Sequence, residues 1–386
     1  MTAKAPAPPP PIGDDERRRR IDALRQKMQR AGADAVLLGS TTSLLYFTGV
    51  QWSPSERFLG ALISADRIDY VAPAFEESKV ESLIAIPGEL HLWQEEESPW
   101  RLIADRAGTR TIALDGDLPL FMYRALRREI ADDSLADAVP LIAPLRARKS
   151  PAEIALMAHA KRITLEAQRR ARQFLKEGVY ASDVARFIDE THRSLGGGAS
   201  TFCIVAFGAD TSLPHGPDKD RALKGGDAVL IDTGCRVDGY HSDITRSYVF
   251  GDPTPDYRRA WDAESEAQAA AFDAARRGAL CESVDAAARR ALERLGYGPG
   301  YLLPGLPHRT GHGIGLDIHE SPNLVKGDRT PLDVGMCFSN EPMIVEPGKF
   351  GVRHEDHFHI SGEGPCWFTK PAASLDDPFA GVPAFG

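Results

Sequence analysis

The spacing of apolar positions predicts a first part in which helices and strands alternate. Residues 14–32 carry Ile21, Leu24 and Met28 on one face, which predicts a helix that ends at Gly32. Beyond it the pattern predicts strands at 35–38, 59–63 and 68–71 and helices at 76–86 and 120–131. This alternation is typical of one mixed α/β domain.

A junction is visible at residues 143–154, where a capping pattern begins a long helix. Ser150 stands at the N-cap position, Pro151 at the first helical position, and Glu153 completes a capping box. We expect this helix to run to Gly178, which would cap its end. A second helix is predicted from Ser182 to the glycine run at 196–198.

Beyond residue 200 the order of elements repeats. Strands are predicted at 202–207 and 228–232, helices at 256–277 and 283–295, and then a glycine-rich loop and a final pair of strands. Two rounds of helix, helix and strands suggest two similar halves. We therefore expect an α+β chain with a disordered Pro-rich tail (1–13), a smaller α/β domain (14–145) and a larger domain (146–386).

Length and charge narrow the class of protein. A chain of 386 residues exceeds the size at which one core usually divides, which agrees with two domains. The net charge of -9 argues against a nucleic-acid binder, and we interpret the basic clusters at 17–20 and 146–149 as solvated helix ends or linkers. No apolar run is long enough to span a membrane, and the first residues lack the apolar stretch of a secretory signal.

The cysteines indicate a reducing compartment. The chain has five, widely scattered and never in a C-x-x-C pair. A disulfide framework or a metal–thiolate site is therefore not expected, and the cytoplasm is the predicted location.

Two aspartates are predicted on one face of a hairpin in A-V-L-I-D-T-G-C-R-V-D-G-Y-H-S-D-I-T-R, residues 228–246. Asp238-Gly239 is a strong two-residue turn signal between β-prone runs. With that turn, Asp232 lies opposite Thr245, and Asp243 lies on the diagonal of the same face. Two carboxylates placed in this way can hold a metal ion between them.

Three histidines follow in a glycine-rich segment without helical or strand periodicity, G-L-P-H-R-T-G-H-G-I-G-L-D-I-H-E. His312, between Gly311 and Gly313, is the best ligand candidate because glycine lets the backbone approach a ligand closely. His308 and His319 are better placed to contact a substrate or to support the ligands.

The last acidic segment, residues 335–360, supplies two glutamates. Glu341 ends a strand-like run, whereas its rival Glu346 precedes Pro-Gly and indicates a turn. The final strand is predicted as one continuous alternation over 352–360, with Arg353 and Glu355 on the same face.

Five side chains thus form a candidate metal site: Asp232, Asp243, His312, Glu341 and Glu355. Four carboxylates and one imidazole cannot crowd together without cations to neutralise them. Two divalent ions would do so, and a pair of ions about 3.5–4 Å apart is a hydrolytic device. Oxygen-rich ligation with one imidazole suits manganese, with zinc or cobalt as alternatives.

At this point the chain resembles a known family, the pita-bread metallopeptidases. The likeness lies in the motifs D-T-G, S-D-I-T-R, G-H-G-I-G-L-D-I-H-E, N-E-P and G-V-R-H-E-D, taken in that order, and in R-K-S-P before the long helix. Within the family the chain is most similar to the Xaa-Pro dipeptidases (prolidases) and the Xaa-Pro aminopeptidases. The resemblance implies a creatinase-like N-terminal domain and a C-terminal pita-bread catalytic domain.

The resemblance also implies roles for individual residues. The five ligands would hold two ions, with Asp243 and Glu355 bridging them and a hydroxide between the ions as nucleophile. Glu341 would accept the proton of the attacking water. The substrate would be contacted by His215 and His319 near the scissile bond and by His308 and Arg353 at its proline end.

Two positions depart from the family pattern. The tyrosine expected after N-E-P is replaced by Val345, so a hydroxyl is missing. His354 stands where an aliphatic residue is usual, and with His357 and His359 it suggests an end of the site that is wetter or more pH-sensitive. Neither change removes a ligand.

The resemblance leads us to expect a dipeptidase that cleaves Xaa-Pro. The alternatives are an aminopeptidase acting on longer Xaa-Pro peptides and a hydrolase of a small non-peptide C–N bond; a binding module that has lost catalysis is disfavoured because every ligand is present. The expected partners are a small peptide substrate and a second copy of the chain, in a homodimer, with no nucleic acid and no membrane.

Overall fold

The computed structural model describes residues 7–108, 110–383 and 385. Contacts divide the chain into two compact units, one of residues 12–146 and the other of residues 147–386 with the described residues before Ile12. Residues 1–6 of the predicted tail lie outside the described residues, and residues 7–13 contain neither helix nor strand.

The smaller unit is built on a six-stranded sheet in the order β4-β3-β2-β1-β5-β6. β1, β2 and β3 pair antiparallel, whereas β4, β5 and β6 join the sheet in parallel. The strands are β1 (Ala35–Leu38), β2 (Gly60–Ser64), β3 (Ile68–Pro73), β4 (Glu89–Trp93), β5 (Ile112–Leu114) and β6 (Leu135–Asp137). The helices are α1 (Asp14–Ala31), α2 (Thr42–Thr48), α3 (Glu77–Leu83), α4 (Pro99–Ala107), α5 (Leu120–Leu126) and α6 (Val139–Ala147).

The predictions for the smaller unit are confirmed for its first helix and its first three strands. α1 buries Ile21, Leu24 and Met28, and the three predicted strands are present to within two residues at their ends. The helix predicted at 120–131 is wrong in its length, because α5 ends at Leu126 and short turns follow. Elements as short as β5 and β6, with three residues each, show too little periodicity to be predicted.

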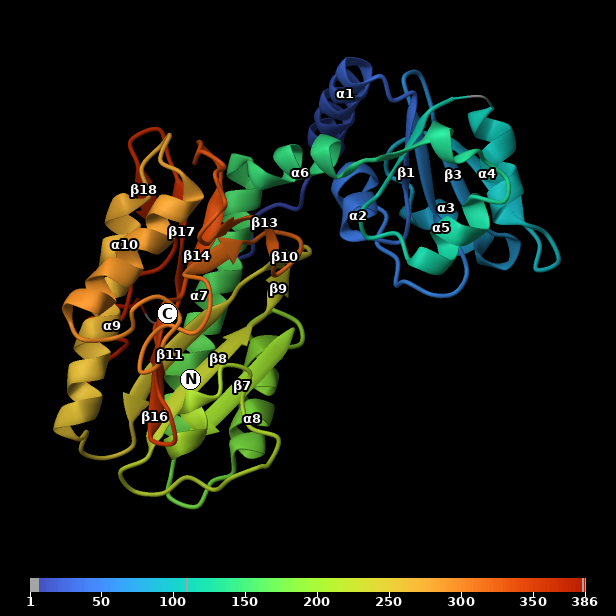
Figure 1. Ribbon diagram of the computed structural model, residues 1–386. Coiled ribbons are helices and arrows are strands. Elements are labelled where there is room, and N and C mark those ends of the chain that lie inside the picture. The colour runs from blue at the N-terminus through green and yellow to red at the C-terminus, as the bar shows by residue number, and fades with distance from the viewer. Residues whose placement is uncertain (1–6, 109, 384, 386) are drawn as a thin grey trace. The chain divides into compact units, whose positions relative to one another are not determined.

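The larger unit packs four helices against two sheets. The helices are α7 (Pro151–Phe174), α8 (Ala181–Ser194), α9 (Pro255–Ala274) and α10 (Cys281–Arg294). α9 and α10 lie side by side, and α8 packs on β7 (Figure 1). The same arrangement of two helices and an antiparallel sheet occurs twice along this unit, as the repeated order of elements predicted.

One sheet of the larger unit has the order β11-β8-β7 and the other β13-β12-β14-β17-β18. Two ribbons, β9–β10 and β15–β16, extend from them. The strands are β7 (Phe202–Phe207), β8 (Ala228–Gly234), β9 (Arg236–Val237), β10 (Tyr240–His241), β11 (Ile244–Val249), β12 (Gly311–Gly313), β13 (Glu320–Leu324), β14 (Cys337–Asn340), β15 (Met343–Glu346), β16 (Phe350–Arg353), β17 (Asp356–Ile360) and β18 (Pro365–Trp367).

The start of α7 follows its prediction, but its end does not. Ser150 and Glu153 form the capping box, and Pro151 is the first helical residue. The helix ends at Phe174 because Leu175 takes an extended conformation. Gly178 is not its cap; it lies in the following turn with a positive φ, and its N–H donates to Leu223 O.

Two further expectations are wrong for the larger unit. The final strand is not continuous, because β16 ends at Arg353 and β17 begins at Asp356, with His354 and Glu355 between them. Lys149 is not solvated; it is buried and pairs with Glu320 at 3.0 Å.

Candidate metal centre

The hairpin that carries Asp232 and Asp243 has the predicted geometry. Asp238 and Gly239 both have positive φ, as a type I′ turn requires. Asp232 on β8 pairs with Thr245 on β11, and Asp243 lies immediately before that strand. Both aspartates are 6% exposed, so the hairpin of β8 and β11 places two buried carboxylates close together.

His312 presents one ring nitrogen to these carboxylates. Its Nδ1 lies 2.9 Å from Gly313 O, which can only accept a hydrogen bond, so Nδ1 carries the proton and Nε2 keeps a lone pair. Nε2 lies 3.2 Å from Glu341 and 3.9 Å from Asp243. His312 lies in a short strand, β12, although its segment was predicted as a loop.

Glu341 and Glu355 enter the site from the second sheet. Glu341 follows β14, and its N–H donates to Thr310 O. Glu355 lies in the break between β16 and β17, where its N–H donates to Thr245 O and its carboxylate accepts from Thr245 Oγ1 at 2.8 Å. This bridge joins the two sheets at the site.

The structure therefore brings the five predicted ligands together. Ligand atoms of Asp243, His312 and Glu355 lie within 4.8 Å of one another. Glu341 belongs to the same cluster because it contacts His312. Asp232 belongs to it because it lies on the same face of the hairpin as Asp243.

The electrostatics of the cluster require positive charge. Burial, followed by the charge of Glu355, raises the pKa of Asp243 well above its ordinary value. Burial, followed by Glu341 and Asp232, does the same to the pKa of Glu355. For Glu341 burial acts in the same direction, but the hydrogen bond and charge that His312 supplies in its doubly protonated form outweigh it and lower the pKa of Glu341.

The unpaired atoms of the cluster fit divalent cations. Among the described residues, Asp232 Oδ1, Asp243 Oδ1 and Glu355 Oε1 are buried without a hydrogen-bond partner. A buried carboxylate oxygen without a partner costs free energy unless it is protonated or coordinates a cation. Oxygen donors and one neutral imidazole are ligands that hard and borderline divalent ions accept.

Arg353 is the buried cation beside these carboxylates. Its guanidinium pairs with Asp232, and its Nε lies 3.1 Å from Thr245 Oγ1. Although burial acts to lower it, the charges of Asp232 and then Glu355 raise the pKa of Arg353 above its ordinary value. Arg353 and Glu355 reach the same Thr245 hydroxyl, which agrees with their prediction on one face.

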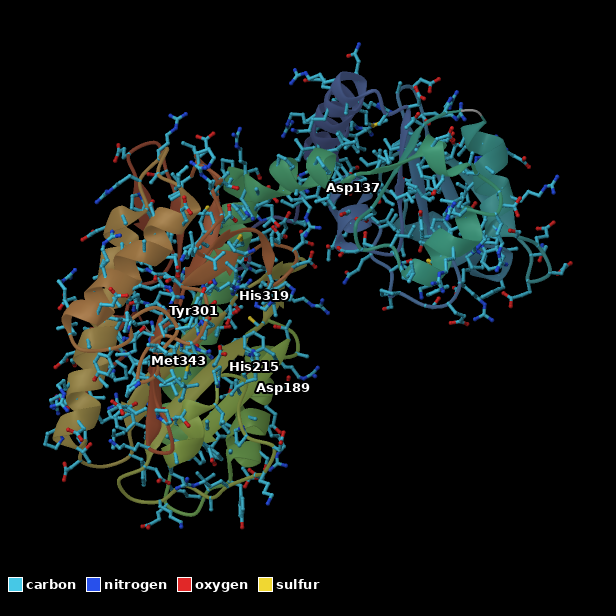
Figure 2. The ribbon with its side chains drawn as sticks, in the orientation of Figure 1. Asp137, Asp189, His215, Tyr301, His319 and Met343 are labelled. Carbon is cyan, nitrogen blue, oxygen red and sulfur yellow. The ribbon has the colours of Figure 1, made fainter. Side chains whose placement is uncertain are left out.

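The three predicted substrate histidines have different surroundings. The ring of His319 is 4.3 Å from that of His312, and burial, followed by the charge of His312, lowers the pKa of His319 to about 4. His308 Nδ1 donates to Arg309 O, and His308 Nε2 is buried without a partner. His215 is exposed on the loop that follows β7 (Figure 2).

The two departures from the family pattern have different surroundings. Val345 is buried on β15 and exchanges backbone hydrogen bonds with Gly305. His354 is 1% exposed, pairs with Glu264 on α9 at 2.5 Å and packs on Trp261. The expected wetter end of the site is therefore wrong, because His354 turns toward a helix and His357 is also fully buried.

A buried network behind the ligands was not predicted. Arg246 donates to both carboxylate oxygens of Asp356, at 3.1 and 2.8 Å, and to the carbonyl oxygens of Thr245 and Glu355. Both side chains of this ion pair are 0% exposed. In the sequence Arg246 is only the last residue of the S-D-I-T-R motif. No local pattern indicates that it pairs with Asp356, 110 residues away.

Lys161 on α7 is a second unpredicted group near the site. It is fully buried, donates to His241 O at 3.1 Å and lies 4.9 Å from the centre of the Phe368 ring. Burial lowers the pKa of Lys161 to about 8, while the nearby Cys337, Asp243 and Glu355 act to raise it.

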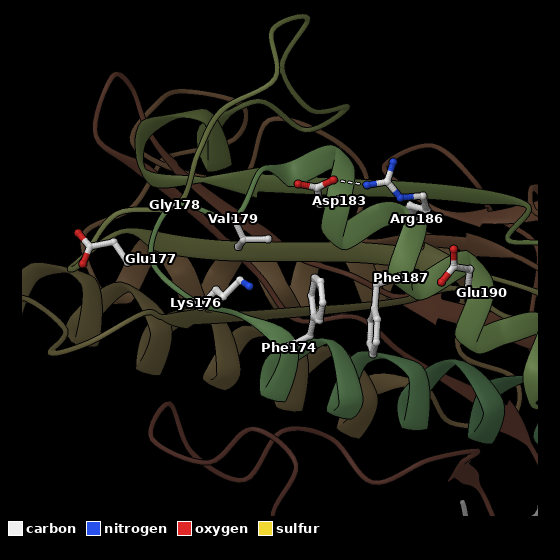
Figure 3. Close-up of a pocket in the computed structure, with 9 residues that line it drawn as sticks. All are labelled: Phe174, Lys176, Glu177, Gly178, Val179, Asp183, Arg186, Phe187 and Glu190. Atoms are coloured by element: carbon white, nitrogen blue, oxygen red, sulfur yellow. Dashed lines mark hydrogen bonds and ion pairs between the residues drawn. The ribbon is translucent and has the colours of Figure 1, made fainter.

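A cavity elsewhere contains none of the predicted site residues. It has a volume of about 380 Å³ and lies between the end of α7 and α8, over the stacked rings of Phe174 and Phe187 (Figure 3). A smaller cavity of about 250 Å³ is lined by His215 together with β7 and the start of α8.

Comparison with known proteins assigns both units to families. Residues 155–361 match metallopeptidase family M24, and residues 20–148 match the creatinase/prolidase N-terminal domain. The chain belongs to the M24 metallopeptidases. The expected fold, a creatinase-like N-terminal domain followed by a pita-bread catalytic domain, is thereby confirmed.

Individual M24 relatives are similar along nearly the whole chain. An Xaa-Pro dipeptidase of Lactobacillus helveticus is 33% identical over 92% of this chain and 98% of its own. Dipeptidase PepE from Mycobacterium ulcerans has a TM-score of 0.88 at 31% identity, covering 95% and 99% of the two chains. A prolidase from Thermococcus sibiricus has a TM-score of 0.83 at 28% identity, covering 92% and 96%.

These comparisons identify the protein as a peptidase of the Xaa-Pro dipeptidase/prolidase family. The family uses divalent metals, and the buried ligand group is the candidate site for them. Within the described residues, the M24 chain has no helix of the length and apolar character needed to cross a membrane.

The buried Arg246–Asp356 pair leads to a prediction about stability. Arg246→Met leaves Asp356 buried without its cation, so we expect a loss of about 3–5 kcal/mol in the free energy of unfolding, measured by urea denaturation. The exposed pair Arg258–Asp376 supplies a matched control, and Arg258→Met should lower the free energy of unfolding far less than Arg246→Met. Equal losses in the two variants would contradict the role given to Arg246.

Proposed function

We propose that this M24 chain is a dinuclear metallo-dipeptidase that hydrolyses the bond before proline in Xaa-Pro dipeptides. Asp232, Asp243, His312, Glu341 and Glu355 would hold the two divalent ions, with Asp243 and Glu355 bridging. The observation that carries the proposal is the set of buried, partnerless carboxylate oxygens around the free lone pair of His312 Nε2. Manganese is the proposed ion, and zinc or cobalt would also suit the ligands.

The ions would supply Lewis acidity and a water whose pKa is lowered to about 7, a nucleophile at neutral pH. The surrounding residues would transfer the proton and stabilise the charge that develops on the substrate. Glu341, whose carboxylate lies 3.2 Å from His312 Nε2, would accept a proton from the attacking water. His319, whose ring lies 4.3 Å from that of His312, and His215 would each offer an imidazole N–H to the charge that develops on the scissile carbonyl oxygen.

His308 and Arg353 would meet the proline end of the substrate. His308 Nε2 has no partner, so it is free to contact a carboxylate, and it donates a hydrogen bond there in its protonated form. Arg353 adds fixed positive charge from beside Asp232. The bond before proline lacks an N–H, so selection must depend on the ring and the carboxylate rather than on a hydrogen bond to the amide.

The relatives support the same substrate class. The Lactobacillus helveticus protein is named an Xaa-Pro dipeptidase, and the Thermococcus sibiricus protein a prolidase. Buried Val345, without the hydroxyl expected from the family, keeps a related hydrolase of a small non-peptide C–N bond as the second candidate.

The substrate proposal is tested with a short peptide panel. We expect manganese-loaded protein to hydrolyse an Xaa-Pro dipeptide faster than Xaa-Pro-Yaa, whose carboxylate lies one residue beyond His308. The dipeptide should also be hydrolysed faster than Xaa-Ala, which lacks the proline ring. A marked preference for the tripeptide would instead assign an aminopeptidase. Chelation and Glu355→Gln should each abolish turnover and lower the metal content, whereas Glu363→Gln, in an exposed turn, should change neither.

The raised pKa values predict how metal affinity depends on pH. Protons compete with the ion at Asp243 and Glu355, so affinity should increase as pH rises above the ordinary carboxyl range and these groups lose their protons. Calorimetric titration of chelator-treated protein with Mn²⁺ at several pH values, in buffers of different ionisation enthalpy, would measure the affinity and the protons released. Affinity that is independent of pH, with no proton release, would contradict this assignment.

A homodimer and a reducing cytoplasmic setting remain proposals. The five cysteines are free in the structure, which is compatible with a reducing compartment. Light scattering of the purified protein would give its mass in solution, and fractionation of the source cells would give its location.

A further inference from the structure

The segment between α10 and β12 carries His308 but has little regular structure of its own. No helix or strand interrupts residues 295–310, all of which the structure describes. One attachment is the backbone pairing of Gly305 with Val345 on β15. The position of His308, three residues further on, therefore depends on other contacts.

Arg289 on α10 supplies these contacts through one planar guanidinium. Its NH1 donates to Gly300 O at 2.7 Å and to Leu306 O at 3.3 Å, and its NH2 donates to His308 O at 2.5 Å. The same group lies 4.2 Å from the centre of the Tyr301 ring. One side chain thus binds three carbonyl groups of the segment, including that of His308 itself.

Asp285, one turn earlier on α10, fixes Arg289 and extends the attachment toward the metal ligands. One oxygen of Asp285 accepts from Arg289 Nε at 2.9 Å. The other accepts from the N–H of Thr310 at 3.1 Å and from its hydroxyl at 2.7 Å. Thr310 O in turn accepts from the N–H of Glu341, and His312 lies two residues beyond.

The side chain of His308 is aimed into the site by this arrangement. Its Nδ1 donates a hydrogen bond to Arg309 O, and its Nε2 is buried without a hydrogen-bond partner. The charges of Glu341 and Arg353 both act on the pKa of His308, so the ring lies near the ligand cluster, although the residue as a whole is partly exposed. Arg289 contacts only the carbonyl of His308 and leaves its ring free.

We propose that Arg289, held by Asp285, is a positioning residue that sets where His308 meets the carboxylate of the substrate. The inference rests on the proposed function for the identity of that carboxylate. Its physical basis is the planar fork of arginine, which donates in several directions at once; lysine has one compact ammonium and cannot span these acceptors. A shift of His308 by about 1 Å would be enough to weaken substrate binding markedly.

The test compares acid and amide forms of one substrate. We expect Arg289→Ala and Arg289→Lys to raise KM for an Xaa-Pro dipeptide roughly tenfold, with kcat within about threefold of wild type, because ground-state binding at the carboxylate is lost. KM for the Xaa-Pro amide should change little. Metal content should stay at the wild-type value, and Arg294→Ala, which removes an exposed pair on the same helix, should leave both substrates unaffected.

A double-mutant cycle separates positioning from a general structural role. If Arg289 acts through His308, the variant carrying Arg289→Ala and His308→Ala should raise the KM for the dipeptide no further than His308→Ala alone. Additive effects, or equal losses with the acid and the amide, would overturn the proposal. Lysine at position 289 restoring the wild-type KM would also overturn it.

Hydrogen exchange provides a readout that needs no substrate. Arg289→Ala should speed amide exchange across residues 298–310 and leave exchange in β8 and β11 unchanged. Unchanged exchange in that segment would overturn the proposal. If wild-type protein fails to cleave Xaa-Pro while the segment loosens as expected, the proposed function fails and the attachment through Arg289 stands.

Discussion

The repulsion among Asp232, Asp243, Glu341 and Glu355 is the constraint on which the rest of the catalytic unit depends. Four buried carboxylates destabilise a fold unless cations and hydrogen-bond donors offset their charge. Arg353 offsets part of it, and three oxygens still lack partners within the described residues. A site of this kind can persist only if the backbone around it is held by other contacts.

Those contacts lie directly behind the ligands. The bridge from Thr245 to Glu355 joins the two sheets, and Arg246 binds the carbonyl groups of these same residues while it pairs with Asp356. The break between β16 and β17 is where Glu355 leaves the regular ladder and reaches the site. Ligand placement is thus set by main-chain positions, which vary less than long side chains do.

The sequence was sufficient for features whose determinants are close together. The Asp238-Gly239 turn fixes the pairing of Asp232 with Thr245 by counting residues, and Ser150 with Glu153 fixes the start of α7. The break at His354 was missed because the alternation of side chains continues through it, and only the pairing of Glu355 with the other sheet interrupts the strand. The Arg246–Asp356 pair and buried Lys161 were missed because their partners are distant in the sequence, and local patterns carry no information about such contacts.

The histidines near the carboxylate cluster are neutral at neutral pH, which leaves room for the charge of a metal ion. Burial, which acts first in both cases, lowers the pKa values of His308 and His319, so at neutral pH their rings add no positive charge that would oppose an incoming cation. Arg353 is different: its charge is permanent, and its pairing with Asp232 keeps it on one side of the site. Neutral rings can still change state when an anionic substrate arrives, because a carboxylate beside His308 Nε2 favours the protonated form. The arrangement therefore accommodates a cation and a substrate carboxylate in the same buried space, provided that the backbone of His308 holds its position.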